Sequence, residues 1–285
     1  MGGCEFNRVR SIQEGREPAI DRRLVQQGFR KDKVQTITTP HSLDTRRVVV
    51  TLLKRIPGRF SAELGLTLAR DRPRDLFLWF LASILYGARI SGTIAAHTFA
   101  EFVRHGLVTP DQLIKTGWDG LVEVLDAGGY VRYDYKTATK MLEVMHTLVD
   151  RYAGDLNRLH DAAADARDVE ARLKALGKGI GEVTVEIFLR ELRGVWPKAD
   201  PPVASLAVLA ANHLWLWEPH VTGAEFSHSE ALKRCWIDNS IKGKQVSDFE
   251  SALVRLGRDY CRNERCESCP MREYCADRPD QTEAR

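Results

Sequence analysis

Residues 176–181 read Leu-Gly-Lys-Gly-Ile-Gly, and this stretch decides how the middle of the chain folds. Glycines two residues apart permit positive φ angles and a tight turn. Helical patterns flank the stretch at 168–176 and 181–192. The second helix begins at the turn, so its unpaired backbone N–H groups can face a phosphate, and Lys178 adds a positive charge. The stretch predicts a hairpin suited to a nucleic-acid backbone; the alternative is an ordinary turn between helices.

The rest of the chain also follows a helical pattern. We expect further helices at 42–56, 73–86, 91–104, from 109, at 118–125, 135–152 and 246–260, and an apolar stretch at 203–216. Ser91 and Thr109 are the expected N-caps of two of them, with Pro110 in the first position of its helix. No segment alternates with a period of two for long, so the pattern predicts an all-α fold.

Composition is that of a soluble globular protein. The chain has 285 residues, of which 44% are hydrophobic and 28% charged, enough for one large domain or two ordinary ones. No apolar run approaches the roughly 20 residues needed to cross a bilayer. The N-terminus has no apolar signal region, so we expect a cytoplasmic protein whose thiols stay reduced.

The net charge of +3 conceals an uneven distribution. Residues 1–74 contain 16 Lys and Arg against 8 Asp and Glu, so the remaining chain is acidic on balance. A basic segment suits contact with phosphates. The alternative is a solvated arm, and we expect residues 1–40 to be basic and partly disordered.

Four of the six cysteines lie within fifteen residues near the end of the chain. The spacing is C-x4-C-x2-C-x5-C, formed by Cys261, Cys266, Cys269 and Cys275. Four thiolates at such spacing can converge on one soft metal centre, either an iron–sulfur cluster or tetrahedral zinc. Spacing alone slightly favours zinc. Arg262 and Arg265 lie between the first two cysteines, where a stiffened loop presents them to a phosphate.

These features occur in an order that resembles the helix-hairpin-helix DNA glycosylase superfamily, and in particular its endonuclease III branch. The resemblance covers about 76–275. The stretch 121–138 looks like the family's glycine-containing loop before a helix start, and 177–184 looks like its hairpin. Trp196-Pro-Lys-Ala-Asp200 looks like the segment that delivers the catalytic aspartate, and the cysteine loop looks like the family's [4Fe–4S] loop.

The resemblance implies a two-lobed, all-α fold. Its helical barrel lobe would span 75–195, and the iron–sulfur cluster lobe would combine 41–74 with 196–285. The implied function is a base-excision-repair glycosylase that acts on double-stranded DNA containing a damaged or mismatched base, and we expect it to act as a monomer.

The same resemblance, together with residue chemistry, proposes roles for individual side chains. Asp200 would stabilise the sugar cation or orient water. Tyr130, Tyr133 and Tyr135 would stack on a flipped base, and Arg89 would fill the gap it leaves. The DNA-binding set is Gly177, Lys178, Gly179, Ile180 and Gly181 of the hairpin, together with Arg89, Arg262 and Arg265.

Three departures keep alternatives open. Val183 occupies the position of the lysine that gives family members strand-cleaving lyase activity, which predicts a monofunctional enzyme unless Lys178 supplies the amine. Pro201 and Pro202 follow Asp200, which favours a DNA-binding protein with a decayed active site. The first cysteine spacing is shorter than the family's, which favours a zinc-stabilised helical adaptor.

Overall fold

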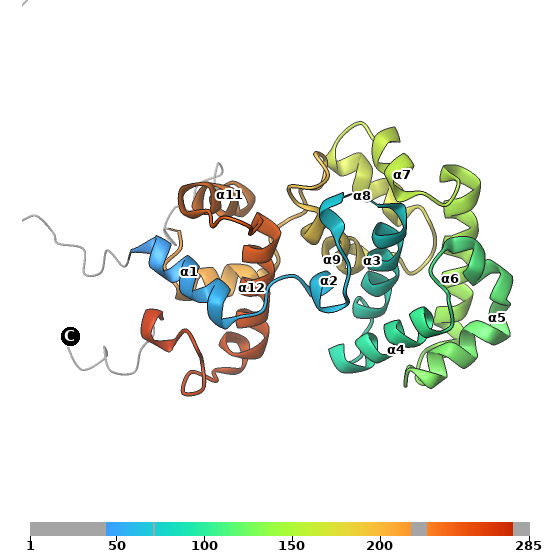
Figure 1. The fold of residues 1–285 in the computed structure, drawn as a ribbon, viewed down its shortest axis with the longest axis horizontal. Coiled ribbons are helices and arrows are strands. Elements are labelled where there is room, and N and C mark those ends of the chain that lie inside the picture. The colour runs from blue at the N-terminus through green and yellow to red at the C-terminus, as the bar shows by residue number, and fades with distance from the viewer. Residues whose placement is uncertain (1–43, 71, 218–226, 276–285) are drawn as a thin grey trace, which may run out of the picture. The chain divides into compact units, whose positions relative to one another are not determined.

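The computed structural model describes residues 44–70, 72–217 and 227–275. Within these ranges every regular element is a helix, and the single β-bridge joins Arg193 to Trp196. The predicted all-α fold is therefore confirmed (Figure 1). The predicted basic arm, 1–40, lies outside the described residues, as does Cys4.

The described residues form α-helices (α) and short 3-10 helices (η). They are α1 (Thr45–Arg55), α2 (Phe60–Glu63), η1 (Leu68–Arg70), α3 (Pro73–Tyr86), α4 (Gly92–Arg104), α5 (Pro110–Ala127), α6 (Asp134–Tyr152), α7 (Leu156–Ala162), α8 (Ala166–Lys174), α9 (Glu182–Leu192), α10 (Ser205–His213), α11 (His228–Asn239), α12 (Val246–Asp259), η2 (Cys261–Asn263) and η3 (Arg272–Tyr274). None of the described helices is long and apolar enough to span a membrane.

Local sequence signals set several helix ends. Ser91 caps α4 by accepting a hydrogen bond from the backbone N–H of Ile94 at 3.2 Å. Thr109 caps α5 through Gln112 at 3.3 Å, with Pro110 in the first helical position. Gly117 breaks α5 with φ 72°, a conformation that glycine adopts without steric cost. The two short helices predicted at 109 and 118 are thus the two halves of α5.

Helix α3 is the apolar centre of the segment between residues 73 and 192. Its side chains from Leu76 to Ala82 are almost completely buried, as the sequence predicts. It packs against α4, α7 and α9, while α5 packs along α6 (Figure 1). The indole N–H of Trp79 donates to the carbonyl oxygen of Phe188 at 3.1 Å, which ties α3 to α9.

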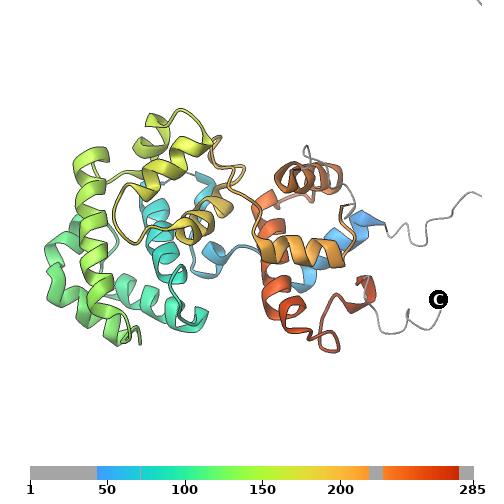
Figure 2. The ribbon, with the colours of Figure 1, turned by 180° about the vertical axis from the view of Figure 1, so that it is seen from behind.

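Helix α12 organises the C-terminal helices and joins them to the first described helix. It contacts α1, α9, α10 and α11, and Figure 2 shows α10 crossing it. A Cβ on Gly257 would lie 2.0 Å from the carbonyl oxygen of Leu206, so only glycine permits this approach. From α1, Arg55 donates to the carbonyl oxygen of Pro270 at 2.6 Å and pairs with Glu273 at 2.7 Å.

Buried charges connect α9 with α12 and with the segment before α3. Glu191 is fully buried and accepts hydrogen bonds from the backbone N–H groups of Phe60 and Ser61 at 2.6 and 2.9 Å. Arg193 pairs with the fully buried Glu250 at 2.8 Å. The described residues all belong to one compact unit, and the predicted division into two lobes stays a prediction.

Candidate nucleic-acid interface and base pocket

The hairpin between α8 and α9 is present and is held tightly against α6. Gly179 has φ 114°, a conformation that side chains with a Cβ rarely adopt. A Cβ on Gly177 would lie 2.8 Å from Cγ2 of Val144, so the turn approaches α6 too closely for a larger residue. The backbone N–H of Lys178 donates to Oε1 of Glu143 at 3.3 Å. Glu143 therefore occupies one backbone N–H group of the hairpin turn, while the N–H groups at the start of α9 belong to the next element.

The N-terminus of α9 keeps the character of an anion site. Its N-cap is Gly181, which supplies no side-chain acceptor for the first N–H groups. Anions are stabilised at such a helix end by the N–H groups and the helix dipole. One side chain opposes anion binding at this helix end. The carboxylate of Glu182 lies in the first turn, where it pairs with Lys174 at 3.6 Å. The side chain of Val183 is 57% exposed and carries no amine.

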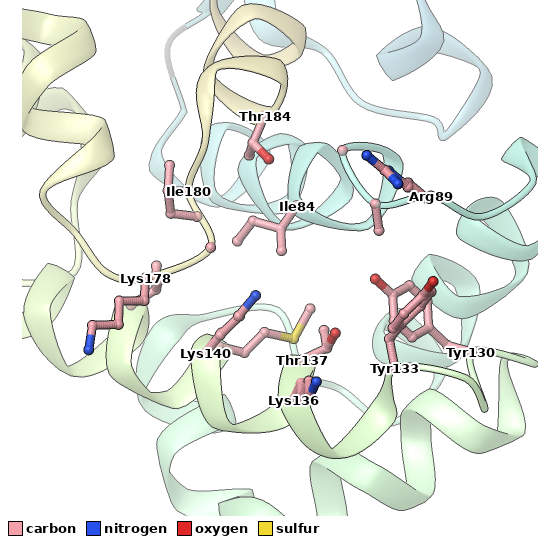
Figure 3. Close-up of a pocket in the computed structure, with 15 residues that line it drawn as sticks. Ile84, Arg89, Tyr130, Tyr133, Lys136, Thr137, Lys140, Lys178, Ile180 and Thr184 are labelled. Atoms are coloured by element: carbon pink, nitrogen blue, oxygen red, sulfur yellow. The ribbon is translucent and has the colours of Figure 1, made fainter.

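A pocket of about 410 Å³ opens beside the hairpin (Figure 3). It brings together residues from the end of α3, the loop before α6, the first half of α6 and the hairpin. Six residues proposed as site residues from the sequence line it: Arg89, Tyr130, Tyr133, Lys178, Gly179 and Ile180. Its other polar or charged lining residues are Lys136, Thr137, Lys140 and Thr184, and its apolar ones include Ile84, Met141 and Val144.

The pocket is basic and partly aromatic. Four cationic side chains line it, and none of its lining residues is Asp or Glu. Burial raises the pKa of the Tyr130 hydroxyl, which therefore stays neutral. Figure 3 places Tyr130 and Tyr133 next to each other, across the pocket from Ile180. This arrangement can accept a planar group that carries hydrogen-bond acceptors or negative charge.

Tyr135 is not part of this pocket. Its ring stacks on Trp118 with centroids 5.4 Å apart, and the indole N–H of Trp118 donates to Oγ1 of Thr139 at 3.0 Å. Tyr135 is 59% exposed. Tyr130 and Tyr133 precede α6, whereas Tyr135 lies within it. The twist of the helix directs the Tyr135 side chain away from the pocket.

Asp200 is held by three donors at the end of the loop after α9. The buried Arg193 guanidinium donates to Oδ1, as does the Ser229 hydroxyl at 2.7 Å, and Lys233 donates to Oδ2 at 2.6 Å. Burial alone would raise the pKa of Asp200, but these hydrogen bonds and the two positive charges together lower it. Asp200 is therefore an ionised, partly exposed carboxylate, and it does not line the pocket.

The sequence alone did not reveal the side chains that donate hydrogen bonds to Asp200. Arg193, Ser229 and Lys233 come from distant positions and meet at Asp200 only through tertiary packing. Lys140 gave a detectable signal, because it follows Lys136 by four residues and such pairs share one face of a helix.

The cysteine loop follows α12 through η2 and η3. No disulfide joins the described cysteines, and all four loop cysteines are partly buried. The backbone N–H of Met271 donates to Sγ of Cys269 at 3.4 Å, and Sγ of Cys275 lies 4.0 Å from Nδ1 of His213. Burial and the three neighbouring thiols raise the pKa of Cys261 to about 12. Cys235, outside this loop, is buried in the core.

The donor chemistry of this loop suits a four-thiolate centre. The described residues contain no group of three or more His, Cys, Asp and Glu side chains arranged to hold a metal ion. Arg262 and Arg265 are exposed beside the first two cysteines. The metal centre and its identity therefore stay predictions.

Comparisons with known proteins give likeness in structure only. No protein-family model matches the chain, and no curated protein matches it in sequence. A trapped endonuclease III–DNA covalent intermediate is similar, with 14% identity and a TM-score of 0.45 over 83% of this chain and 98% of that one. A non-covalent endonuclease III–DNA complex gives 15% and 0.45 over 84% and 98%. A thermostable thymine-DNA glycosylase is similar at 16% identity and a TM-score of 0.48, over 83% of this chain and 98% of that chain.

Proposed function

We propose that the protein is a DNA glycosylase of base-excision repair, which hydrolyses the N-glycosidic bond of a damaged or mismatched base. The observation that carries the proposal is the pocket in which the glycine hairpin, Tyr130, Tyr133 and Arg89 meet. An enzyme that acts on a base must take it out of the duplex, and it needs an aromatic, polar pocket next to a surface for the DNA backbone.

The duplex would be bound mainly through its phosphates. The uncapped start of α9, Lys178, Arg262 and Arg265 supply positive charge or N–H donors, and Arg89 at the rim would fill the place of the flipped base. The barrel lobe and the cluster lobe predicted from the sequence would then bind the duplex as a monomer, with the cysteine loop contributing its two arginines.

Asp200 is the proposed catalytic carboxylate. Its lowered pKa keeps it charged at neutral pH, and its partial exposure leaves it accessible to a sugar cation or an attacking water. Bond cleavage without a lysine at position 183 would proceed through water and not through a Schiff base. The enzyme is accordingly proposed to be monofunctional.

The four loop cysteines are proposed to hold a structural [4Fe–4S] cluster, with zinc as the alternative. Sulfur ligands, their burial and the N–H donor from Met271 suit either group. When bound, the cluster would stiffen the loop that carries Arg262 and Arg265. It takes no part in the proposed chemistry.

A second candidate function is DNA binding without catalysis. It is favoured by the engagement of Asp200 with Arg193, Ser229 and Lys233, and by its absence from the pocket lining. A carboxylate that is neutralised by two cations is a poorer stabiliser of a sugar cation than an unpaired one.

Base release by the wild type and by Asp200→Asn separates the two functions. On a panel of duplexes that each contain one damaged base, we expect the wild type to release at least one base and Asp200→Asn to release none, while DNA affinity changes little. Borohydride should trap no covalent adduct with the wild type. Full activity of Asp200→Asn would assign the carboxylate role elsewhere, and strong trapping would contradict the monofunctional assignment.

A further inference from the structure

Lys140 projects from α6 into the basic pocket, and the hairpin fixes its course. A Cβ built on Gly179 would lie 2.7 Å from Cδ of Lys140 and 3.4 Å from its Cγ and Cε. The aliphatic stem of Lys140 therefore lies directly over the hairpin backbone, in space that only glycine leaves open. In Figure 3 its Nζ points into the pocket, whereas Lys178 points away from it.

Among the described residues, no carboxylate forms an ion pair with the Lys140 ammonium, and Glu143, three residues later on α6, accepts the backbone N–H of Lys178 instead. No Asp or Glu lines the pocket, and the part of the chain that the structure describes places no carboxylate within ion-pair distance of Lys136, Lys140 or Lys178. The side chains that line the pocket with Lys140 include the apolar Ile84 and Ile180. Bound DNA would remove water from the pocket and so strengthen the field of this ammonium.

The proposed hydrolysis creates a charge that such an ammonium can stabilise. The bond between C1′ and the base nitrogen breaks, and both of its electrons stay on that nitrogen. Water adds its oxygen to C1′ and loses a proton to solvent, while the departing base takes a proton from solvent. A neutral base with carbonyl groups thus leaves as an anion, whereas a base that already carries a positive charge leaves as a neutral molecule.

We infer that Lys140 stabilises a departing anionic base and thereby sets the substrate class, an inference that rests on the proposed glycosylase function. The class comprises neutral bases whose carbonyl groups accept hydrogen bonds, such as uracil and its substituted or oxidised derivatives. Alkylated bases with a fixed positive charge, such as 7-methylguanine, are excluded because the cations that face the pocket repel them.

A leaving-group comparison tests the role of Lys140. Uracil and 5-fluorouracil have nearly the same size, but 5-fluorouracil is the more acidic and needs less help to leave as an anion. Single-turnover rates are measured on duplexes carrying each base, for the wild type, Lys140→Met and Lys115→Met. Lys115 is an exposed lysine of α5 that does not line the pocket, so Lys115→Met is a matched control for loss of one charge.

The expected result is a change in sensitivity to the leaving group. Lys140→Met should slow uracil release by about 100-fold, the loss typical of removing one transition-state donor, and 5-fluorouracil release by roughly 10-fold. Lys115→Met should leave both rates and their ratio at wild-type values. The wild type should release uracil while leaving 7-methylguanine at its spontaneous rate.

A duplex with a tetrahydrofuran abasic analogue has no leaving group and isolates binding. Lys140→Met should bind it nearly as tightly as the wild type. If Lys140 instead contacts a phosphate, this affinity falls, the slope of log affinity against log salt drops by about one, and both bases slow equally. That outcome overturns the inference and leaves the glycosylase proposal standing. Release of 7-methylguanine as fast as uracil also overturns it, and no release of any base overturns both.

Discussion

Single side chains set the state of the candidate catalytic carboxylate. Asp200 accepts from Arg193, Ser229 and Lys233, and Arg193 in turn donates to Glu250 and to the carbonyl oxygen of Pro201 at 2.6 Å. The proline pair that follows Asp200 is thus part of the arrangement that holds it, because the Pro201 carbonyl uses a donor of Arg193. An ordered carboxylate can serve catalysis or structure, and its titration reports how strongly it is held.

The pKa of Asp200 predicts a defined dependence of stability on pH. Because its folded pKa lies below its unfolded value of about 3.9, the ionised carboxylate stabilises the fold above that pH, and this contribution is lost as pH falls through the folded pKa. Asp200→Asn should therefore lower the urea midpoint at pH 7, and the difference from wild type should shrink below about pH 4. Equal midpoints at pH 7 would contradict the prediction.

We expect the replacement of glycine by alanine to destabilise the fold by different amounts at two positions of the hairpin. Gly179→Ala places a Cβ against the stem of Lys140 at φ 114°, and strain of this kind costs about 1–3 kcal/mol. Gly181→Ala meets nothing within 4 Å and keeps an extended φ of −92°, so it should cost less than about 1 kcal/mol. Urea unfolding of the two variants measures the contrast, and equal losses would show that the Lys140 contact is unimportant.

The ends of a helix could be predicted where a local sequence signal sets them. They could not be predicted where tertiary packing sets them. Ser91, Thr109 and the glycine hairpin gave the ends of α4, α5 and α9, because each acts on its own backbone. We did not predict α7 or α11. The seven-residue α7 ends where Lys198 donates to the carbonyl oxygens of His160 and Ala163 at 2.9 and 2.6 Å. Such a distant donor leaves no trace in the local sequence.

The same distinction between local sequence signals and tertiary packing applies to the residues of the candidate site. Glycine spacing and aromatic residues predicted the hairpin, Tyr130 and Tyr133, because backbone conformation and residue type carry that information locally. Tyr135 lies outside the pocket, and its direction depends on the exact start of α6, at Asp134. The inward course of Lys140 depends on how closely the hairpin packs on α6, which no local pattern encodes.

We expect the stability of the cysteine loop to depend on a bound metal centre. Cys269 accepts an N–H from Met271, and Met271 and Tyr274 are buried beside the loop, so loss of a ligand should disturb their packing. Cys269→Ser should lose bound iron and sulfide and lower the thermal midpoint, whereas Cys235→Ser should retain the metal. Iron, sulfide and zinc are measured on protein prepared without oxygen. One equivalent of zinc without iron would contradict the cluster.

The distribution of charge over the molecule predicts how DNA affinity responds to salt. Basic groups are proposed to meet phosphates at the hairpin, at Arg262 and Arg265, and in the basic first 74 residues. If a few phosphates are neutralised, affinity should fall roughly tenfold or more between low and physiological ionic strength. Titrations of one undamaged duplex at several salt concentrations measure this slope. A flat response, or no binding at low salt, would contradict phosphate-led binding.

The pairing of α1 with α12 has a consequence for synthesis of the chain. Helix α1 buries Val48, Val49 and Leu52, and the helices that contact it, α11 and α12, are translated about 180 or more residues later. At ~5–20 residues per second, roughly 10–40 s pass before these partners leave the ribosome. Through that interval the apolar face of α1 lacks its native cover. Helix α1 is thus the first described helix to be synthesised and among the last to complete its packing. A nascent chain stalled before residue 246 would leave the apolar face of α1 exposed to other proteins.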